Sequence, residues 1–77
     1  MDIENLVRMA NRIGDFFGAL PDADEAVDGV ANHLQRFWEP RMRAAILRHL
    51  DATGGAGLQP VVVEALRKHR ATLAPAA

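Results

Sequence analysis

The three histidines are the side chains in this sequence best suited to metal binding or catalysis, and their spacing argues against a shared site. His33, His49 and His69 lie sixteen and twenty residues apart, whereas metal ligands on one helical face are three or four residues apart. The chain has no cysteine, which removes thiolate ligands, and no serine, which removes a Ser-His-Asp triad. We therefore predict ordinary interhelical histidines, no metal site and no catalytic residue.

Two further patterns are better explained by helix ends than by a ligand. Carboxylates gather at Asp22, Asp24, Glu25 and Asp28, in the first turns of a predicted helix, where negative charge suits the helix dipole. The glycines of residues 54–57 lack the Gly-Lys-Ser/Thr ending of a phosphate-binding P-loop. We interpret this loop as a helix stop, because glycine readily adopts the left-handed geometry found there.

One segment gathers the residue types that dominate protein interfaces. Residues 36–43 read Arg-Phe-Trp-Glu-Pro-Arg-Met-Arg and contain the only tryptophan of the chain. On a helical wheel Arg41 and Arg48 flank one side of the following helix and Arg43 the other, while Leu47 points outward. The alternative is that Phe37 and Trp38 fill the core and the arginines are merely solvated. We predict a partner-binding surface formed by Arg36, Phe37, Trp38, Pro40, Arg41, Met42, Arg43, Leu47 and Arg48.

Four amphipathic segments, with apolar residues at steps of three and four, must position these side chains. The first begins after Asp2 and ends near Leu20, the second runs from Asp22 to a break at residues 38–40, and the third spans about residues 40–52. The fourth begins at Pro60 and includes residues 61–63, because a lone strand would have no partner. The sequence predicts an all-α fold, a small bundle of three to four short helices with no sheet. We expect a single helical domain over residues 1–70 and a frayed C-terminal tail over residues 71–77.

The first predicted helix has an apolar face wider than one neighbouring helix needs, because Met9 and Phe16 lie together on its margin. This margin is the next candidate for a docking surface. It would serve self-association of the isolated chain equally well.

Composition limits the remaining classes of function. The chain has 77 residues, of which 49% are hydrophobic and 25% charged, and no apolar run approaches the roughly 18 residues of a membrane span. The N-terminus lacks the basic and apolar stretch of a secretory signal, so we expect a cytoplasmic protein. Residues 36–48 carry four arginines, but seven acids in residues 1–28 make a poor footprint for nucleic acid. We expect neither membrane nor nucleic-acid partners.

The segment around the tryptophan also carries a family resemblance. Residues 33–43, His-Leu-Gln-Arg-Phe-Trp-Glu-Pro-Arg-Met-Arg, closely resemble the hallmark stretch of the delta subunit of soluble, molybdenum-containing, NAD-dependent formate dehydrogenases. Residues 9–17 resemble the N-terminal helix of that family, and residues 54–60 resemble its loop into the last helix. The resemblance covers most of residues 5–66.

The resemblance implies a non-catalytic accessory subunit of an oxidoreductase complex. In such complexes the alpha subunit oxidises formate at a bis-molybdopterin guanine dinucleotide centre, and electrons pass through iron–sulfur clusters to a flavin and NAD. The delta subunit holds no cofactor stably and is thought to aid assembly, cofactor loading or stability of the alpha subunit, its expected partner. The sequence permits a transient contact of arginines and helix N-termini with the dinucleotide. The alternatives are a stand-alone homo-oligomeric helical protein and a small helical nucleic-acid-binding module.

Overall fold

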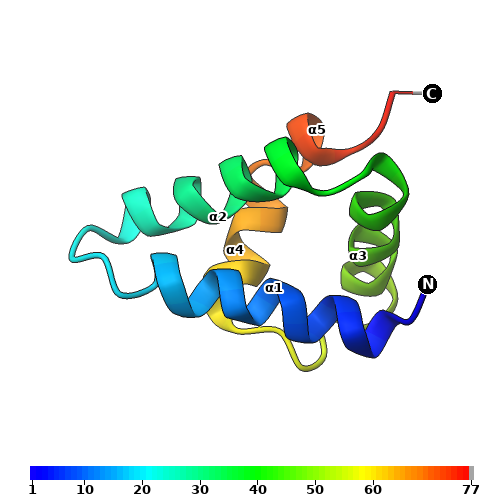
Figure 1. The fold of residues 1–77 in the computed structure, drawn as a ribbon, viewed down its shortest axis with the longest axis horizontal. Helices are drawn as coiled ribbons and strands as arrows, with labels where there is room; N and C mark the ends of the chain where they lie inside the picture. The colour runs from blue at the N-terminus through cyan, green and yellow to red at the C-terminus, as the bar shows by residue number, and fades with distance from the viewer. Residues whose placement is uncertain (77) are drawn as a thin grey trace.

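The computed structural model describes residues 1–76, and within them the chain forms helices and no strand. The helices are α1 (Ile3–Phe17), α2 (Ala23–Phe37), α3 (Pro40–Thr53), α4 (Pro60–Lys68) and the single turn α5 (Arg70–Leu73), shown in Figure 1. The predicted all-α fold is confirmed, and residues 61–63 lie in α4.

Capping residues explain where the helices begin and end. Asp2 accepts a hydrogen bond from the backbone N–H of Glu4 at 2.9 Å, and Asp22 accepts one from the N–H of Asp24 at 2.8 Å. Proline occupies the first turn of both α3 and α4, where its missing N–H forfeits no helical hydrogen bond. Gly54 ends α3 with a φ of 74°, in the left-handed region. The predicted helix starts and the glycine stop are confirmed.

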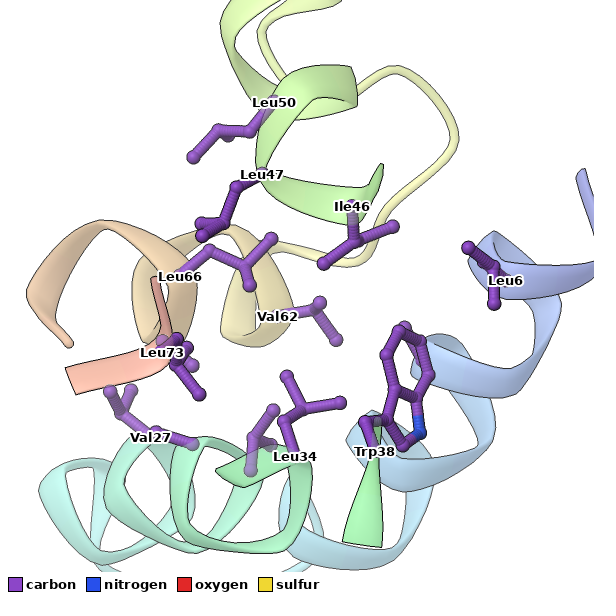
Figure 2. Close-up of a cluster of buried hydrophobic side chains, with 14 residues drawn as sticks. Leu6, Val27, Leu34, Trp38, Ile46, Leu47, Leu50, Val62, Leu66 and Leu73 are labelled. Carbon is purple, nitrogen blue, oxygen red and sulfur yellow. The ribbon is translucent and has the colours of Figure 1, made fainter. Parts of the chain in front are cut away.

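The helices pack around one apolar core. α1 and α2 lie alongside each other, α4 lies behind this pair, and α3 stands across the end where α1 begins and α2 ends (Figure 1). No helix within residues 1–76 is long and apolar enough to cross a membrane. The largest fully buried side chains are Leu34, Ile46, Leu66, Leu73, Val30 and Val62, several of which Figure 2 shows converging from different helices.

The C-terminal segment differs from the predicted frayed tail. Residues 70–73 form α5, and Leu73 is only 1% exposed because it packs into the core (Figure 2). Arg70 fastens this turn to α3, since its Nη1 donates to Asp51 Oδ1 at 2.8 Å. The helix at residues 70–73 thus contacts the rest of the fold through one buried leucine and one ion pair, although a single turn has little stability of its own. Ala77, the last residue of the predicted tail, lies outside the described residues.

Two stretches distant in sequence, α1 and the loop before α4, are joined by one side chain. Asn11 Nδ2 donates to the backbone oxygen of Gly57, and the backbone N–H of Gln59 donates to Asn11 Oδ1, both at 2.9 Å. Because the amide serves as donor and acceptor at once, it satisfies two loop groups and fixes the start of α4 against α1.

Candidate interaction surface

The residues predicted to bind a partner do not lie on one face of the molecule. Trp38 is 6% exposed and Leu47 is 4% exposed, and both side chains point into the core (Figure 2). The outward direction predicted for Leu47 is wrong, because α3 packs against α1 as well as against α4 and α5. Its buried face is therefore wider than a single seam. Neither side chain can meet a partner while the core is intact.

Arg43 and Met42 are half-buried at the elbow between α2 and α3. Arg43 Nη1 donates to the backbone oxygen of Gln35 at 3.0 Å. This oxygen belongs to the last turn of α2, where carbonyl groups lack a partner within the helix. Met42 packs against the buried core, and Pro40 is exposed at the first position of α3. Arg43 therefore connects α3 to the end of α2 through this hydrogen bond.

Arg41 and Arg48 share one flank of α3, as the helical wheel predicts. Both are exposed, and together with Met1, Ala44 and Ala45 they line a hollow of about 290 Å³. This flank and the elbow are separate features, because Arg43 turns to the other side of α3 toward α2.

Phe37 and Arg36 belong to a different surface, along the junction of α1 and α2. The rings of Phe16, Phe17, His33 and Phe37 lie one after another, and we call them the aromatic row. The centroids of neighbouring rings are 4.9 Å apart for Phe16–Phe17, 6.2 Å for Phe17–His33 and 4.8 Å for His33–Phe37. The guanidinium carbon of Arg36 lies 5.8 Å from the centroid of Phe37, within the range of a cation–π interaction.

The ends of the aromatic row are exposed to solvent, and its middle is hollowed. Phe16 is 71% exposed and Phe37 is 67% exposed, whereas Phe17 and His33 are half-buried. A hollow of about 320 Å³ is lined by Arg12, Ile13, Phe16, Phe17 and His33. Exposed aromatic rings beside arginines are the combination enriched at the energetic centres of protein interfaces. The aromatic row with Arg12 and Arg36 is therefore the candidate interaction surface.

Helical periodicity explains how this surface forms. Phe16 and Phe17 end α1, and His33 and Phe37 are four residues apart on α2, so they lie on the same helical face. Phe37, Arg36 and the Phe16 margin were predictable from the sequence as parts of an interaction surface, whereas Arg12, Phe17 and His33 were not. The His33–Phe37 spacing was the available signal, whereas the contact with Phe17 depends on how α1 packs against α2.

His69 and His49 form hydrogen bonds that connect neighbouring parts of the fold, and Asp28 is the partner of His69. Asp28 Oδ1 lies 2.8 Å from His69 Nε2 and 3.1 Å from Lys68 Nζ, and these hydrogen bonds hold the pKa of Asp28 below its ordinary value of 3.8. His49 Nε2 lies 2.7 Å from the backbone oxygen of Ala56 in the glycine loop. Over residues 1–76, no three potential metal ligands come together. The three histidines thus lie in three separate environments.

These features define a class of protein: a small, all-helical chain with a mixed aromatic and arginine surface. The chain belongs to the family of NADH-dependent formate dehydrogenase delta subunits, FdsD, whose family model matches residues 5–66. No curated protein and no solved structure matches the chain in comparisons of those two kinds. As a delta subunit of formate dehydrogenase, it is a component of a complex with other subunits.

Proposed function

We propose that this delta subunit is a non-catalytic accessory subunit that binds the catalytic alpha subunit and aids its assembly, cofactor loading or stability. The observation that carries the proposal is the family match over residues 5–66, which spans α1 to α4 up to Leu66. The exposed aromatic row supports it, because a chain that works by docking needs a surface of interface composition.

Three carboxylates form capping hydrogen bonds or ion pairs within the fold, and these structural contacts support a non-catalytic role. Asp22 caps α2, Asp28 pairs with Lys68 and His69, and Asp51 pairs with Arg70. The absence of cysteine in the sequence also leaves the chain without the thiolates that hold iron–sulfur clusters. Formate oxidation and electron transfer are therefore assigned to the other subunits.

For cofactor loading, the flank of α3 is the place where a phosphate group would meet this chain. Arg41 and Arg48 line the same hollow, and arginine forks bind phosphate with two parallel hydrogen bonds. A hollow of about 290 Å³ has room for a phosphate group and not for a whole bis-dinucleotide. We therefore propose a transient contact with bis-molybdopterin guanine dinucleotide and no stable binding of it.

Deletion of the gene in the native host tests the accessory role. We expect a lower yield of active formate dehydrogenase, or less molybdenum per alpha subunit, with recovery when the wild-type gene is returned on a plasmid. Molybdenum is measured by mass spectrometry and the alpha subunit by quantitative immunoblot, so that loading and abundance are separated. Normal amounts of fully loaded enzyme in the deletion strain would contradict an assembly role.

Purification of the tagged chain separates this proposal from its two rivals. Co-purification with the alpha subunit supports the accessory role. A homogeneous oligomer of this chain alone would favour the stand-alone helical protein, and bound nucleic acid would favour the nucleic-acid module.

A further inference from the structure

The aromatic row leaves two of the three phenylalanines of the chain largely in water. The fold buries Trp38 and half-buries Phe17, but Phe16 and Phe37, at the two ends of the row, remain 71% and 67% exposed. Burial of aromatic rings is among the largest gains available to a small domain, so exposing two of them is costly unless another molecule covers them. This surface is therefore unpartnered in the isolated chain.

The two charged side chains that the structure places against the row, Arg12 and Arg36, are both arginines. Arg12 lines the hollow and Arg36 lies over Phe37, and neither has an acidic partner among residues 1–76, where the ion pairs involve Lys68, His69 and Arg70. The hollow itself has no carboxylate in its lining. An occupant that complements this surface brings apolar side chains for the rings and carboxylates for the two guanidinium groups.

A second copy of the chain does not supply this complement. In a two-fold dimer through the row, the same surface contributes from both sides. Such a contact would bring together two arginines from each copy, and the row and its hollow would supply no carboxylate to pair with them. Like charges placed together disfavour such a contact, so we choose a different polypeptide as the occupant.

The spacing of the rings also matches a particular secondary structure. Neighbouring centroids in the row lie 4.8 to 6.2 Å apart. One turn of an α-helix rises about 5.4 Å, so apolar side chains one turn apart on a partner helix would meet successive rings.

We propose that the aromatic row receives an acidic amphipathic helix of a partner polypeptide, with apolar side chains on the rings and in the hollow and carboxylates on Arg12 and Arg36. The proposal rests on the proposed function for placing that helix in the formate dehydrogenase complex. The occupant is defined by its chemistry, which is an apolar stripe flanked by aspartate or glutamate.

The test uses the full chain and formate dehydrogenase purified from the deletion strain, which lacks this subunit. Binding is measured by biolayer interferometry for the wild type, for the double variant Phe16→Ala/Phe37→Ala, and for the charge reversal Arg12→Glu/Arg36→Glu. The control is Arg67→Glu, which reverses an exposed arginine of α4 that lines neither the row nor the flank of α3. Circular dichroism checks that each variant is folded. If the phenylalanine variant does not fold, the charge-reversal variant Arg12→Glu/Arg36→Glu decides the test.

We expect each row variant to bind at least about thirtyfold more weakly, the loss typical of one interface hot spot, and the Arg67→Glu control to bind within about threefold of the wild type. Wild-type binding should also weaken with added salt. If folded row variants bind like the wild type, the row is not the docking surface, although the accessory role stands. If the wild type fails to bind the delta-free enzyme, the proposed function fails, and the acidic-helix proposal fails with it.

A separate crosslinking experiment identifies the segment that occupies the row. A photoreactive benzoylphenylalanine at position 16, irradiated in the complex, should crosslink to a peptide with acidic residues around an apolar stripe at helical spacing. A crosslinked peptide without carboxylates would overturn the proposal. So would light scattering that finds a dimer of this chain which Phe16→Ala/Phe37→Ala dissociates.

Discussion

The ring of Phe17 lies directly against Gly29, so that α1 and α2 approach each other where the aromatic row begins. A Cβ atom at position 29 would lie 2.9 Å or less from three atoms of this ring, closer than packed carbon atoms tolerate. Gly29 is on the same face of α2 as His33, one helical turn earlier. The glycine therefore determines where the Phe17 ring sits, and through it the line from Phe16 to Phe37.

We expect Gly29→Ala to destabilise the chain relative to Asn32→Ala, its matched control on α2. Both substitutions raise helix propensity, by at most about 1 kcal/mol, but only the first inserts a methyl group into the Phe17 ring. Overpacking typically costs about 1–3 kcal/mol, which is the expected difference in the free energy of unfolding by urea. Equal stability of the two variants would show that Phe17 moves aside without cost.

The neighbours Phe37 and Trp38 should respond to truncation in opposite ways. Trp38→Ala removes a core side chain that is 6% exposed and should cost about 3–5 kcal/mol, a large part of the roughly 4–12 kcal/mol expected for 77 residues. Phe37→Ala removes a ring that is 67% exposed and should change stability by no more than about 0.5 kcal/mol. Leu47→Ala should behave like Trp38→Ala, with a cost of about 2–5 kcal/mol. A Leu47→Ala variant as stable as the wild type would contradict the buried position of that leucine.

Arg43→Ala and Arg41→Ala should separate a structural arginine from a solvent-exposed one. Arg43 is half-buried and donates to the oxygen of Gln35, so its loss should cost about 1 kcal/mol or more of folding stability. Arg41 is exposed, and its loss should stay within about 0.5 kcal/mol. The measurement is urea unfolding of the two variants beside the wild type. Equal stability of the two would mean that the Gln35 oxygen is served as well by water.

Stability should fall at acidic pH because of two carboxylates that connect helices. Hydrogen bonds from His69 and Lys68 lower the pKa of Asp28, and the hydrogen bond from Arg70 lowers the pKa of Asp51, each from an ordinary value of 3.8. Since the native pKa lies below the unfolded one, the unfolded chain binds more protons as the pH falls. The stabilisation is present above pH 3.8 and is lost as the pH falls through the lower native pKa.

The variants Asp28→Asn and Asp51→Asn test this acid dependence. We expect each to flatten the decline of the unfolding free energy below about pH 4, and the double variant to flatten it further, because the two pairs connect different helices. Lys68 gives the opposite sign, since Asp28 raises its pKa above 10.5 and its contribution is lost only as the pH rises through that higher value. If the unfolding free energy of the double variant declines with falling pH as it does in the wild type, other groups cause the acid sensitivity.

The helices were predictable because their ends depend on local chemistry. Asp2 and Asp22 cap, Pro40 and Pro60 begin a helix, and Gly54 ends one, and each works within a few residues of chain. The direction of Leu47 was predicted wrongly because the helical wheel assumes one buried seam, whereas α3 packs against three helices, α1, α4 and α5.

The candidate surface was only partly predictable for a related reason. Phe37 and Arg36 stand out by residue type, but Phe17 reaches His33 only after α1 has packed on α2 through Gly29. The order of Leu73 likewise depends on a core formed by other helices. Contacts of this kind follow from tertiary packing, which a pattern along one segment does not contain.

The burial of Trp38 gives the chain an internal optical reporter. It is the sole tryptophan, so all indole fluorescence of the isolated chain comes from one site in the core, where water and collisional quenchers do not reach it. Unfolding exposes this indole and shifts its emission to longer wavelength. Because the indole is buried and Phe16 and Phe37 are exposed, we expect a ligand that covers the two rings to leave the emission of Trp38 unchanged, so that this emission reports on the integrity of the core. A spectral shift of Trp38 on complex formation would therefore mean that the partner opens the core.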